Sequence, residues 1–415
     1  MSLIVHKYGG TSLGDLDKIR HVARRVAATK DQGHDVAVVV SAMAGETDRL
    51  INLAYAISPD PPPREVDMLV STGEQVAAAL LAMALSEMGY PAISFTGGQV
   101  GVLTVGVHRK AKIQEISTDR IFDKLRDGRI VIITGFQGVD IDGNITTLGR
   151  GGSDTSAVAI AAVLKADLCE IYTDVNGVYT ADPRIVPSAR KLNKLSHDEM
   201  LDMATLGAKV LQSRSVEFAK KYNVPLAVRS TFSDDPGTLI VEETGEMEQT
   251  KITGVTLLRD QARINVLDLP NVPGIAAKIF NAVAAEHVNV DMIVLTENNY
   301  GGTDISFTIS IGDMKAAQET AQRICNDVSA KGVTVEEDVA KISVVGIGMQ
   351  SQPGVAADVF DAIGSNGINI EMISTSEIKI SCLIKSKDAE HAMRVIHDRF
   401  DLGKDAPASE KTVEA

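Results

Sequence analysis

The sequence predicts a three-layer α/β domain followed by two small α+β units. Strand and helix patterns alternate over about the first 245 residues, as they do in parallel sheets covered by helices. A segment of the remaining chain recurs at an offset of 80 residues, which indicates a duplicated unit. The length of 415 residues suits two or three domains, in agreement with both patterns.

The elements of the first part follow from apolar runs and breakers. Parallel strands are expected where short segments are largely apolar, at 3–8, 35–41, 129–134 and 168–173. Helices are expected where the pattern is amphipathic or rich in alanine, at 16–28, 65–88 and 154–164. A proline-rich run at 58–63 precedes the second of these helices, and Asp142-Gly143 predicts a hairpin turn.

The second part contains the repeat. Nine of 23 positions are identical between 271–293 and 351–373, and Pro273-Gly274 matches Pro353-Gly354. Each repeat predicts a strand, a Pro-Gly turn, a helix, two strands, a helix and a strand. The acidic run 242–248 reads as a linker. The expected domains are 1–245, 262–337 and 338–405, the last completed by a strand at 250–258.

The composition of the chain disfavours several classes of partner and of site. Lys and Arg number 41 against 55 Asp and Glu, a net charge of −14, which disfavours a nucleic-acid or acidic-membrane partner. Cys169, Cys325 and Cys382 lie far apart and are expected to be reduced thiols of a cytoplasmic protein. We expect no secretory leader, no apolar run long enough to span a membrane and no structural metal site.

A glycine-rich run offers the sharpest chemical signal: Gly149-Arg150-Gly151-Gly152-Ser153-Asp154-Thr155. Adjacent glycines leave backbone amides open to an anion, and the helix that follows directs its positive end to the same place. The spacing fits neither the Walker nor the dinucleotide pattern. The alternative is an ordinary glycine-rich turn in which Asp154 caps a helix.

Further candidates follow other strands. Lys7 and the glycines of Lys7-Tyr8-Gly9-Gly10-Thr11-Ser12 would neutralise and approach a phosphate, unless Lys7 is only a solvated residue. Small and hydroxyl residues end the next strand, from Ser41 to Thr47, where open α/β sheets bind ligands. Glu74 would bind an amino group, or alternatively would only interact favourably with the dipole of its helix.

One loop mixes an acid, an aromatic ring and a guanidinium. It runs from Thr173 to Arg184 after another buried strand, a mixture that suits a nucleotide, although a plain polar loop is the alternative. Gly207-Ala208-Lys209-Val210 adds a second cation nearby in sequence. These cations and carboxylates suit phosphoryl transfer, which depends on positioning and charge neutralisation.

Taken together, these motifs resemble those of the bacterial aspartokinases. The similar segments are Lys7–Ser12, Ser41-Ala42-Met43, 149–154 and 172–184, and the duplicated second part resembles their tandem ACT domains. The resemblance covers nearly the whole chain in order. It implies a three-layer amino-acid-kinase domain followed by two ferredoxin-like ACT units.

The resemblance implies a kinase that phosphorylates the side chain of L-aspartate with MgATP, the first step of lysine, threonine and methionine biosynthesis. The implied catalytic residues are Lys7 and Asp154. The implied aspartate-binding residues are Ser41, Thr47, Glu74, Arg150, Gly151, Gly152 and Ser153. The implied ATP-binding residues are Lys7, Tyr8, Gly9, Gly10, Ser12, Thr173, Asp174, Tyr179, Thr180, Ala181, Asp182, Pro183, Arg184, Lys209 and Val210.

The ACT units imply feedback by lysine, threonine or both, and a homo-oligomer, with a shorter regulatory chain of the same gene as a further option. Implied effector positions are Asn271, Pro273, Gly274, Ile275, Ala276, Asn289, Val290 and Asp291 in the first repeat, and Gln352, Val355, Asn369, Ile370, Ser376 and Glu377 in the second. Asn271 and Leu295-Thr296 depart from the family pattern, which puts the first effector site in doubt. Another amino-acid-kinase-fold enzyme and a catalytically silent amino-acid sensor are the alternatives.

Overall fold

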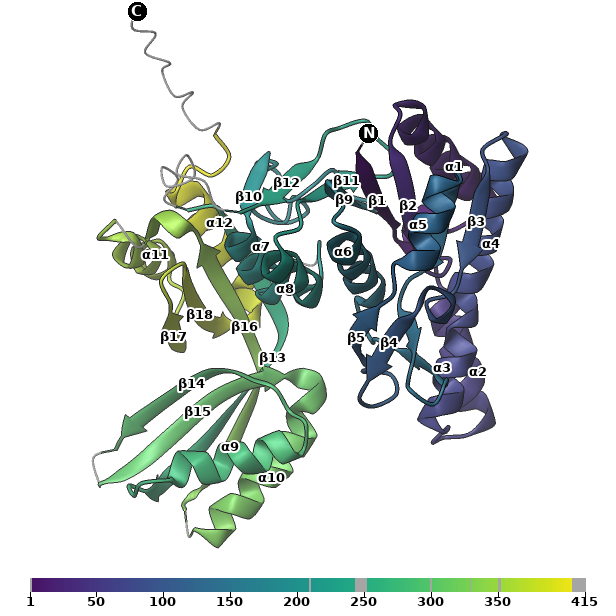
Figure 1. Cartoon of the computed structure of the whole chain (residues 1–415). Helices are drawn as coiled ribbons and strands as arrows, with labels where there is room; N and C mark the ends of the chain where they lie inside the picture. The colour runs from purple at the N-terminus through teal and green to yellow at the C-terminus, as the bar shows by residue number, and fades with distance from the viewer. Residues whose placement is uncertain are drawn as a thin grey trace, which may run out of the picture. The chain divides into compact units, whose positions relative to one another are not determined.

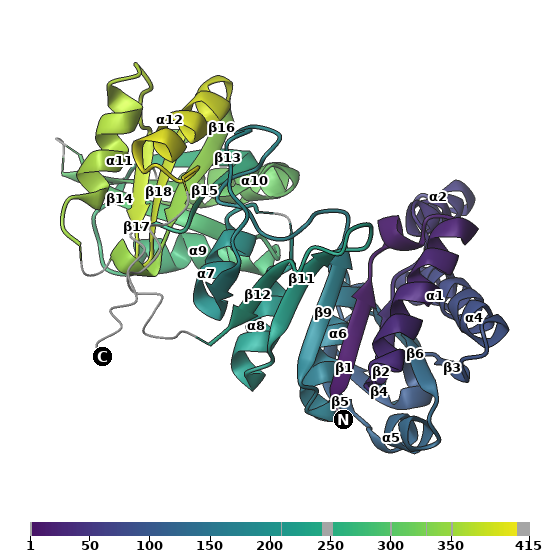
Figure 2. The same cartoon turned by 90° about the horizontal axis from the view of Figure 1, so that it is seen from above.

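The computed structural model describes residues 2–208, 210–242, 252–298, 301–328, 330–349 and 352–404, which form two compact units. The N-terminal unit comprises Met1–Val178, Lys191–Thr205 and Lys209–Thr244. The C-terminal unit comprises Tyr179–Arg190, Leu206–Ala208 and Gly245–Ala415. Figures 1 and 2 show the elements of each unit from two directions.

An eight-stranded sheet forms the centre of the N-terminal unit, in the order β10-β12-β11-β9-β1-β2-β6-β3. Every neighbouring pair is parallel except β11 with β12. The strands are β1 (Leu3–Tyr8), β2 (Asp35–Val40), β3 (Ala92–Phe95), β6 (Ile130–Thr134), β9 (Leu168–Thr173), β10 (Lys194–Ser196), β11 (Leu226–Ser230) and β12 (Thr238–Val241). The alternation of strands and helices therefore predicted the parallel core correctly.

Helices cover both faces of this sheet. Helices α1 (Leu16–Asp31) and α4 (Thr72–Glu87) pack on the face that includes Tyr8 and Val38. Successive side chains of a strand point to opposite faces, so Lys7 points to the other face, where it meets α6 (Gly152–Leu164). The expected three-layer arrangement is confirmed. Other helices of the unit are α2 (Glu46–Ile57), α5 (Asp119–Arg126), α7 (His197–Thr205) and α8 (Ser213–Tyr222).

The long helix expected at 65–88 is two helices. Helix α3 (Pro63–Val70) is followed by Ser71, whose amide still donates to the backbone carbonyl of Asp67, and α4 begins at the next residue. The stretch Pro63–Glu87 is long and apolar enough to cross a membrane by composition, contrary to the expectation that no such run exists. This is weak evidence for a membrane span, because a core helix passes the same test of length and composition.

A small four-stranded sheet lies in the same unit, in the order β5-β4-β7-β8. Its strands are β4 (Val102–Val105), β5 (Lys112–Ile116), β7 (Gln137–Val139) and β8 (Ile145–Thr147). The predicted hairpin joins β7 to β8, with Gly143 in the left-handed region at φ 80°. Strand β8 leads directly into the glycine-rich run that begins at Gly149, so this sheet positions the predicted anion loop.

A six-stranded antiparallel sheet dominates the C-terminal unit, in the order β14-β15-β13-β16-β18-β17. Its strands are β13 (Gly254–Pro270), β14 (Val290–Glu297), β15 (Gly302–Ser310), β16 (Gly332–Val345), β17 (Met372–Thr375) and β18 (Lys379–Lys385). Its helices are α9 (Ile275–Ala285), α10 (Met314–Asp327), α11 (Val355–Gly364) and α12 (Ala389–Arg399).

The two repeats share their long strands. Residues 261–270 of β13 pair with β15, whereas Gly254–Leu258 of the same strand pair with Lys341–Val345 of β16. The second repeat therefore takes a strand from upstream of the first, within the range 250–258 that was expected to complete it. The exact domain boundaries remain a prediction, and 243–248 of the expected linker lie outside the described residues.

A segment of the middle of the chain also belongs to the C-terminal unit. Within Tyr179–Arg190, Ala181 and Val186 join the apolar core of the second repeat. The backbone of Thr180 accepts a hydrogen bond from Val255, and its hydroxyl lies 3.0 Å from His397 Nε2. This segment is therefore held by the C-terminal unit through both apolar and polar contacts.

Candidate functional site

Four neighbouring parallel strands end together and form one edge of the large sheet. Because β9, β1, β2 and β6 are parallel and adjacent, their carboxyl ends lie side by side. The loops that follow are tied across this edge: Ser41 donates to Tyr8, and Gly135 donates to Val40. Residues predicted from separate motifs therefore converge on one edge.

Lys7 and Asp154 form the central contact of this edge. The Lys7 ammonium lies 2.6 Å from Asp154 Oδ1, and both side chains are largely buried. Asp154 stands in the first turn of α6, where the positive end of the helix favours a carboxylate. The arrangement brings a cation and a helix N-terminus to one place, as suits an anion, and Asp154 holds the cation in position.

The glycine loops allow close backbone approach. A Cβ atom on Gly10 would lie 3.0 Å from the carbonyl oxygen of Ala42. A Cβ on Gly151 would lie 1.9 Å from Gln212 Cγ, and Gly151 has φ 67°, a conformation that disfavours other residues. The local geometry thus favours glycine at 151 most strongly and leaves little room for a side chain at Gly10.

Glu74 is a buried carboxyl group at the same edge. It lies in the first turn of α4, and Oε1 accepts a hydrogen bond of 3.2 Å from the amide of Ala42. Oε2 is buried and has no hydrogen-bond partner in the described part of the chain. Burial raises the pKa of Glu74 to about 8. A buried carboxyl with an unsatisfied oxygen is well prepared to receive a cationic group.

The other predicted aspartate-binding residues lie at the ends of strands and helices of the same unit. Ser41 follows β2, Thr47 lies in the first turn of α2, and Ser153 lies in the first turn of α6. Ser153 is packed against the end of β6, since a Cβ on Gly135 would lie 2.9 Å from Ser153 Cβ. Arg150 is exposed in the loop between β8 and α6.

Phe136 belongs to this edge but was missed by sequence reasoning. It has φ 68°, an uncommon conformation for a bulky residue, and its carbonyl accepts a hydrogen bond from Leu148. Its ring packs on Gly152, where a Cβ would lie 2.8 Å from Phe136 Cδ2. The available signal was an aromatic residue directly after a strand-end Gly135, which is weak by itself.

Two of the residues predicted to bind ATP have buried side chains that contact other protein side chains. The ring of Tyr8 is fully buried and stacks on Tyr172 at 4.7 Å between centroids. The hydroxyl of Ser12 is buried and lies 2.6 Å from that of Thr231. For these two positions only the backbone remains to meet a ligand.

The rest of the predicted ATP set is divided between the units. Thr173 ends β9 and Asp174 follows it in the N-terminal unit, which also contains part-buried Val210. Tyr179–Arg184 belong to the C-terminal unit, where Asp182 is paired with Arg184 at 2.7 Å. Lys209 lies outside the described residues. The structure therefore brings Thr173 and Asp174 to the edge of the sheet but describes 179–184 only within the other unit.

The predicted effector residues lie on the turns and strand edges of the two repeats. Gly274 and Gly354 cap α9 and α11 in equivalent left-handed conformations, at φ 91° and 99°. Asp291 pairs with the buried Lys341, and Asn369 donates to Glu371 at 3.2 Å. Most of the predicted positions are exposed or part-buried, with Ile275 and Val355 buried beneath them.

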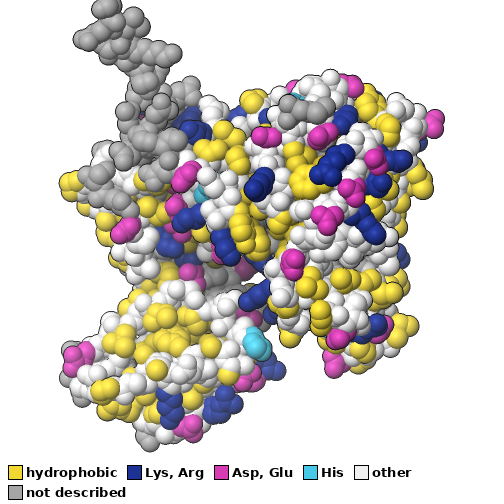
Figure 3. Space-filling model, in the orientation of Figure 1, with side chains coloured by type: hydrophobic (Ala, Val, Ile, Leu, Met, Phe, Trp, Pro, Cys, Tyr) yellow, Lys and Arg dark blue, Asp and Glu magenta, His cyan; other side chains and the backbone are white. Residues whose placement is uncertain are grey.

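Surface charge and candidate metal ligands are the last features of the described residues that bear on a binding site. On the face shown in Figure 3, Lys and Arg side chains are interspersed with Asp and Glu. No group of three or more His, Cys, Asp or Glu in the described residues has the geometry of a metal site.

Comparisons with known proteins show relatives over nearly the whole chain. The model of the amino acid kinase family matches residues 2–230, and that of the ACT domain matches 267–324 and 342–400. An aspartate kinase of Pseudomonas putida is 51% identical over 409 residues, covering 98% of this chain and 99% of the relative. Two crystal structures of E. coli aspartokinase III are 27% identical and cover 96% of this chain and 99% of theirs. The complex with aspartate and ADP (R-state) has a TM-score of 0.82, and that with lysine and aspartate (T-state) has 0.75.

Proposed function

This chain belongs to the amino acid kinase family and, within it, to the aspartate kinases with two ACT domains, and from this premise we propose how its residues work. The γ-phosphoryl group of ATP is transferred to the side-chain carboxylate of L-aspartate, giving 4-phospho-L-aspartate. The observation that carries this proposal is the Lys7–Asp154 pair beside the buried Glu74 at one sheet edge. The aspartate and ADP bound by E. coli aspartokinase III support it.

Electrostatics is the main difficulty of this reaction. The attacking carboxylate is already ionised at pH 7, so no general base is needed. It must, however, approach a polyphosphate of the same charge. Lys7 donates to the transferring phosphoryl group and the amides of Gly9 and Gly10 approach it, which offsets the repulsion most strongly in the transition state. Asp154 orients Lys7 and does not act as a base.

Glu74 and Arg150 orient the amino acid. The ammonium of aspartate meets Glu74 Oε2, which ionises as the charge pair forms. Arg150 binds the α-carboxylate in a two-pronged contact. Ser41, Thr47 and Ser153 add hydrogen bonds, and the amides of Gly151 and Gly152 face the same substrate.

ATP is held by the loops after β1 and β9, and the resemblance implies further ATP contacts from Tyr179, Thr180, Ala181, Asp182, Pro183, Arg184, Lys209 and Val210. Mg²⁺ fits a site with few protein carboxylates, because this ion keeps several waters and binds mainly through substrate phosphates. The described residues have no cluster of three acidic or imidazole side chains, in accord with such binding. When bound, Mg²⁺ would neutralise phosphate charge, and Asp154 would help to hold it.

The two ACT repeats regulate the enzyme by binding end-product amino acids. Lysine and threonine are the proposed effectors, supported by the lysine bound to E. coli aspartokinase III. The effector positions named above lie on turns and edge strands, where a second copy would complete the site, so we propose a homo-oligomer in the cytoplasm. A shorter regulatory chain of the same gene remains a further proposal.

One assay tests the function. Hydroxylamine traps an acyl phosphate as a hydroxamate, and its formation is measured with ATP and aspartate, with ATP and glutamate, or with ATP alone. We expect product with aspartate only. Product with glutamate instead would indicate another enzyme of this fold, and none with either substrate would indicate a silent sensor.

A further inference from the structure

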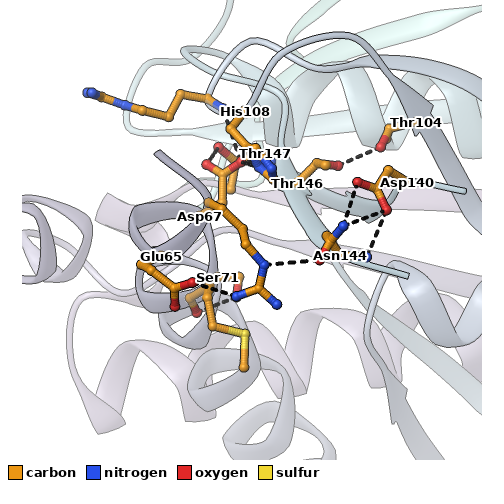
Figure 4. A network of polar contacts seen from close by, with 12 residues as sticks. Glu65, Asp67, Ser71, Thr104, His108, Asp140, Asn144, Thr146 and Thr147 are labelled. Atoms are coloured by element: carbon orange, nitrogen blue, oxygen red, sulfur yellow. Dashed lines mark hydrogen bonds and ion pairs between the residues drawn. The ribbon is translucent and has the colours of Figure 1, made fainter. Parts of the chain in front are cut away.

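Asp67 is a fully buried carboxylate that accepts four hydrogen bonds (Figure 4). It lies in α3 and takes no part in the proposed contacts with aspartate or ATP. Oδ1 accepts from the Thr147 hydroxyl at 2.6 Å, and Oδ2 accepts from the Thr147 amide at 3.1 Å. Oδ2 also accepts from the Arg109 amide at 3.0 Å and from His108 Nδ1 at 2.8 Å.

These donors come from two chain segments that flank the Arg150 loop. Thr147 is the last residue of β8, and Gly149 follows two residues later. His108 and Arg109 belong to the loop between β4 and β5, which reaches the same place, since a Cβ on Gly149 would lie 2.8 Å from the Arg109 carbonyl oxygen. Asp67 therefore binds both chain segments that flank the turn leading to Arg150.

The backbone of this region needs an anchor. Arg109 has φ 67°, a left-handed conformation that is uncommon for a residue other than glycine. Its amide is held in this conformation by Asp67. Arg214 reinforces the same turn by donating to the carbonyls of Leu148 at 3.0 Å and of Ala111 at 3.1 Å.

We propose that Asp67 is a positioning residue for aspartate binding, which acts by fixing the turn that carries Arg150. The inference rests on the proposed role of Arg150 and adds the residue that fixes its position. Arg150 is exposed, so the position of its guanidinium group depends on its backbone and on the preceding turn. A carboxylate suits this task because it accepts several amide and hydroxyl hydrogen bonds at once, whereas an amide supplies one acceptor oxygen.

Asp67→Asn tests the proposal, with Asp140→Asn as the matched control. Asp140 lies in the same network and accepts from the Asn144 amide at 2.8 Å, but it stabilises the far end of the β7–β8 hairpin. We expect Asp67→Asn to raise the KM for aspartate roughly tenfold to a hundredfold, with the KM for ATP unchanged. Asp140→Asn should leave both constants unchanged. A normal aspartate KM in Asp67→Asn, even with a lower unfolding temperature, would reduce Asp67 to a structural residue.

A double-mutant cycle with Arg150→Ala separates this inference from the function on which it rests. If Asp67 acts through Arg150, adding Asp67→Asn to Arg150→Ala will not raise the aspartate KM further. Fully additive effects would overturn the inference. An unchanged aspartate KM in Arg150→Ala alone would instead overturn the role of Arg150.

Thr147→Val covers the case in which Asp67→Asn does not fold. It removes one hydroxyl donor and keeps the amide, so it should raise the aspartate KM severalfold. An unchanged aspartate KM in a folded Thr147→Val would count against the anchor.

Discussion

The ammonium of Lys7 lies 2.6 Å from Asp154 Oδ1, where β1 ends and α6 begins. The two residues come from segments far apart in the chain, and the parallel sheet brings them together. A lysine held by a buried carboxylate keeps a fixed position before any phosphate arrives. Such preorganisation is what electrostatic stabilisation of a transition state needs.

Replacing Lys7 by alanine should lower kcat by roughly a hundredfold to a thousandfold while the fold survives, since one electrostatic group at a reacting centre has about this effect. Steady-state kinetics and circular dichroism measure the two properties. Lys30→Ala is a matched control, because Lys30 pairs with Asp35 away from the carboxyl edge. Near-normal turnover in folded Lys7→Ala would remove Lys7 from the mechanism.

Glu74→Gln should raise the KM for aspartate more than the KM for ATP. The amide keeps the shape of the side chain but cannot form a charge pair with the substrate ammonium. Kinetics with each substrate varied in turn give both constants, and Glu65→Gln, on the exposed side of α3, serves as control. A defect confined to ATP would contradict the assignment.

Proton linkage gives a second test of Glu74. Its pKa is raised by burial to about 8 from the usual 4.5, so the folded enzyme retains a proton there that the unfolded chain loses. The contribution of Glu74 to stability therefore falls as pH rises from 4.5 towards 8. Aspartate binding favours the ionised form, so at pH 7 it should release up to about one proton per site. Calorimetry in buffers of different ionisation enthalpy measures this release, which Glu74→Gln should abolish.

Feedback should act mainly through the second repeat. Asn271 and Leu295-Thr296 depart from the pattern that the family resemblance implies, and each lost effector hydrogen bond weakens binding by roughly 0.5–1.5 kcal/mol. We expect weak inhibition by any amino acid that depends on the first repeat. Activity is titrated with lysine, with threonine and with both. Complete concerted inhibition at low concentrations would contradict this prediction.

Glu170 should make stability sensitive to acid. Burial alone would raise its pKa, but hydrogen bonds from His6 and Tyr172 and the charge of Arg229 hold the pKa at about 2. The stabilisation is present above the usual value of 4.5 and is lost as pH falls from 4.5 towards 2. The difference in urea midpoint between the parent and Glu170→Gln should therefore shrink between pH 7 and pH 3. The exposed Glu115→Gln should show no such trend.

The local elements of the fold could be predicted because they depend on nearby residues. Apolar runs placed β1, β2, β6 and β9 within one or two residues. The break at Ser71 was missed because both sides continue the same helical pattern. The use of Gly254–Leu258 by the second repeat depends on pairing with a strand far along the chain, although its place in that repeat was among the expectations.

The site could be predicted in part for a similar reason. Lys7, Glu74 and Asp154 stand at strand and helix ends, and such ends meet at one edge of a parallel sheet. Asp67 was missed because a single Asp within a helix carries no sign of its four donors. The left-handed conformation of Phe136 likewise depends on packing against Gly152, which the sequence does not display.

Tyr179–Arg190 gives the enzyme an interleaved chain. The polypeptide leaves the N-terminal unit at Tyr179 and contributes Ala181 and Val186 to the core of the C-terminal unit. It returns to the N-terminal unit at Lys191 and crosses again at Leu206. Proteolysis between 242 and 252 would therefore separate Ala181 and Val186 from the core into which they pack. The downstream piece, like the proposed shorter regulatory chain, would lack these two side chains, and the upstream piece would carry them. Separately produced pieces should recombine through Tyr179–Arg190, as complementing fragments do.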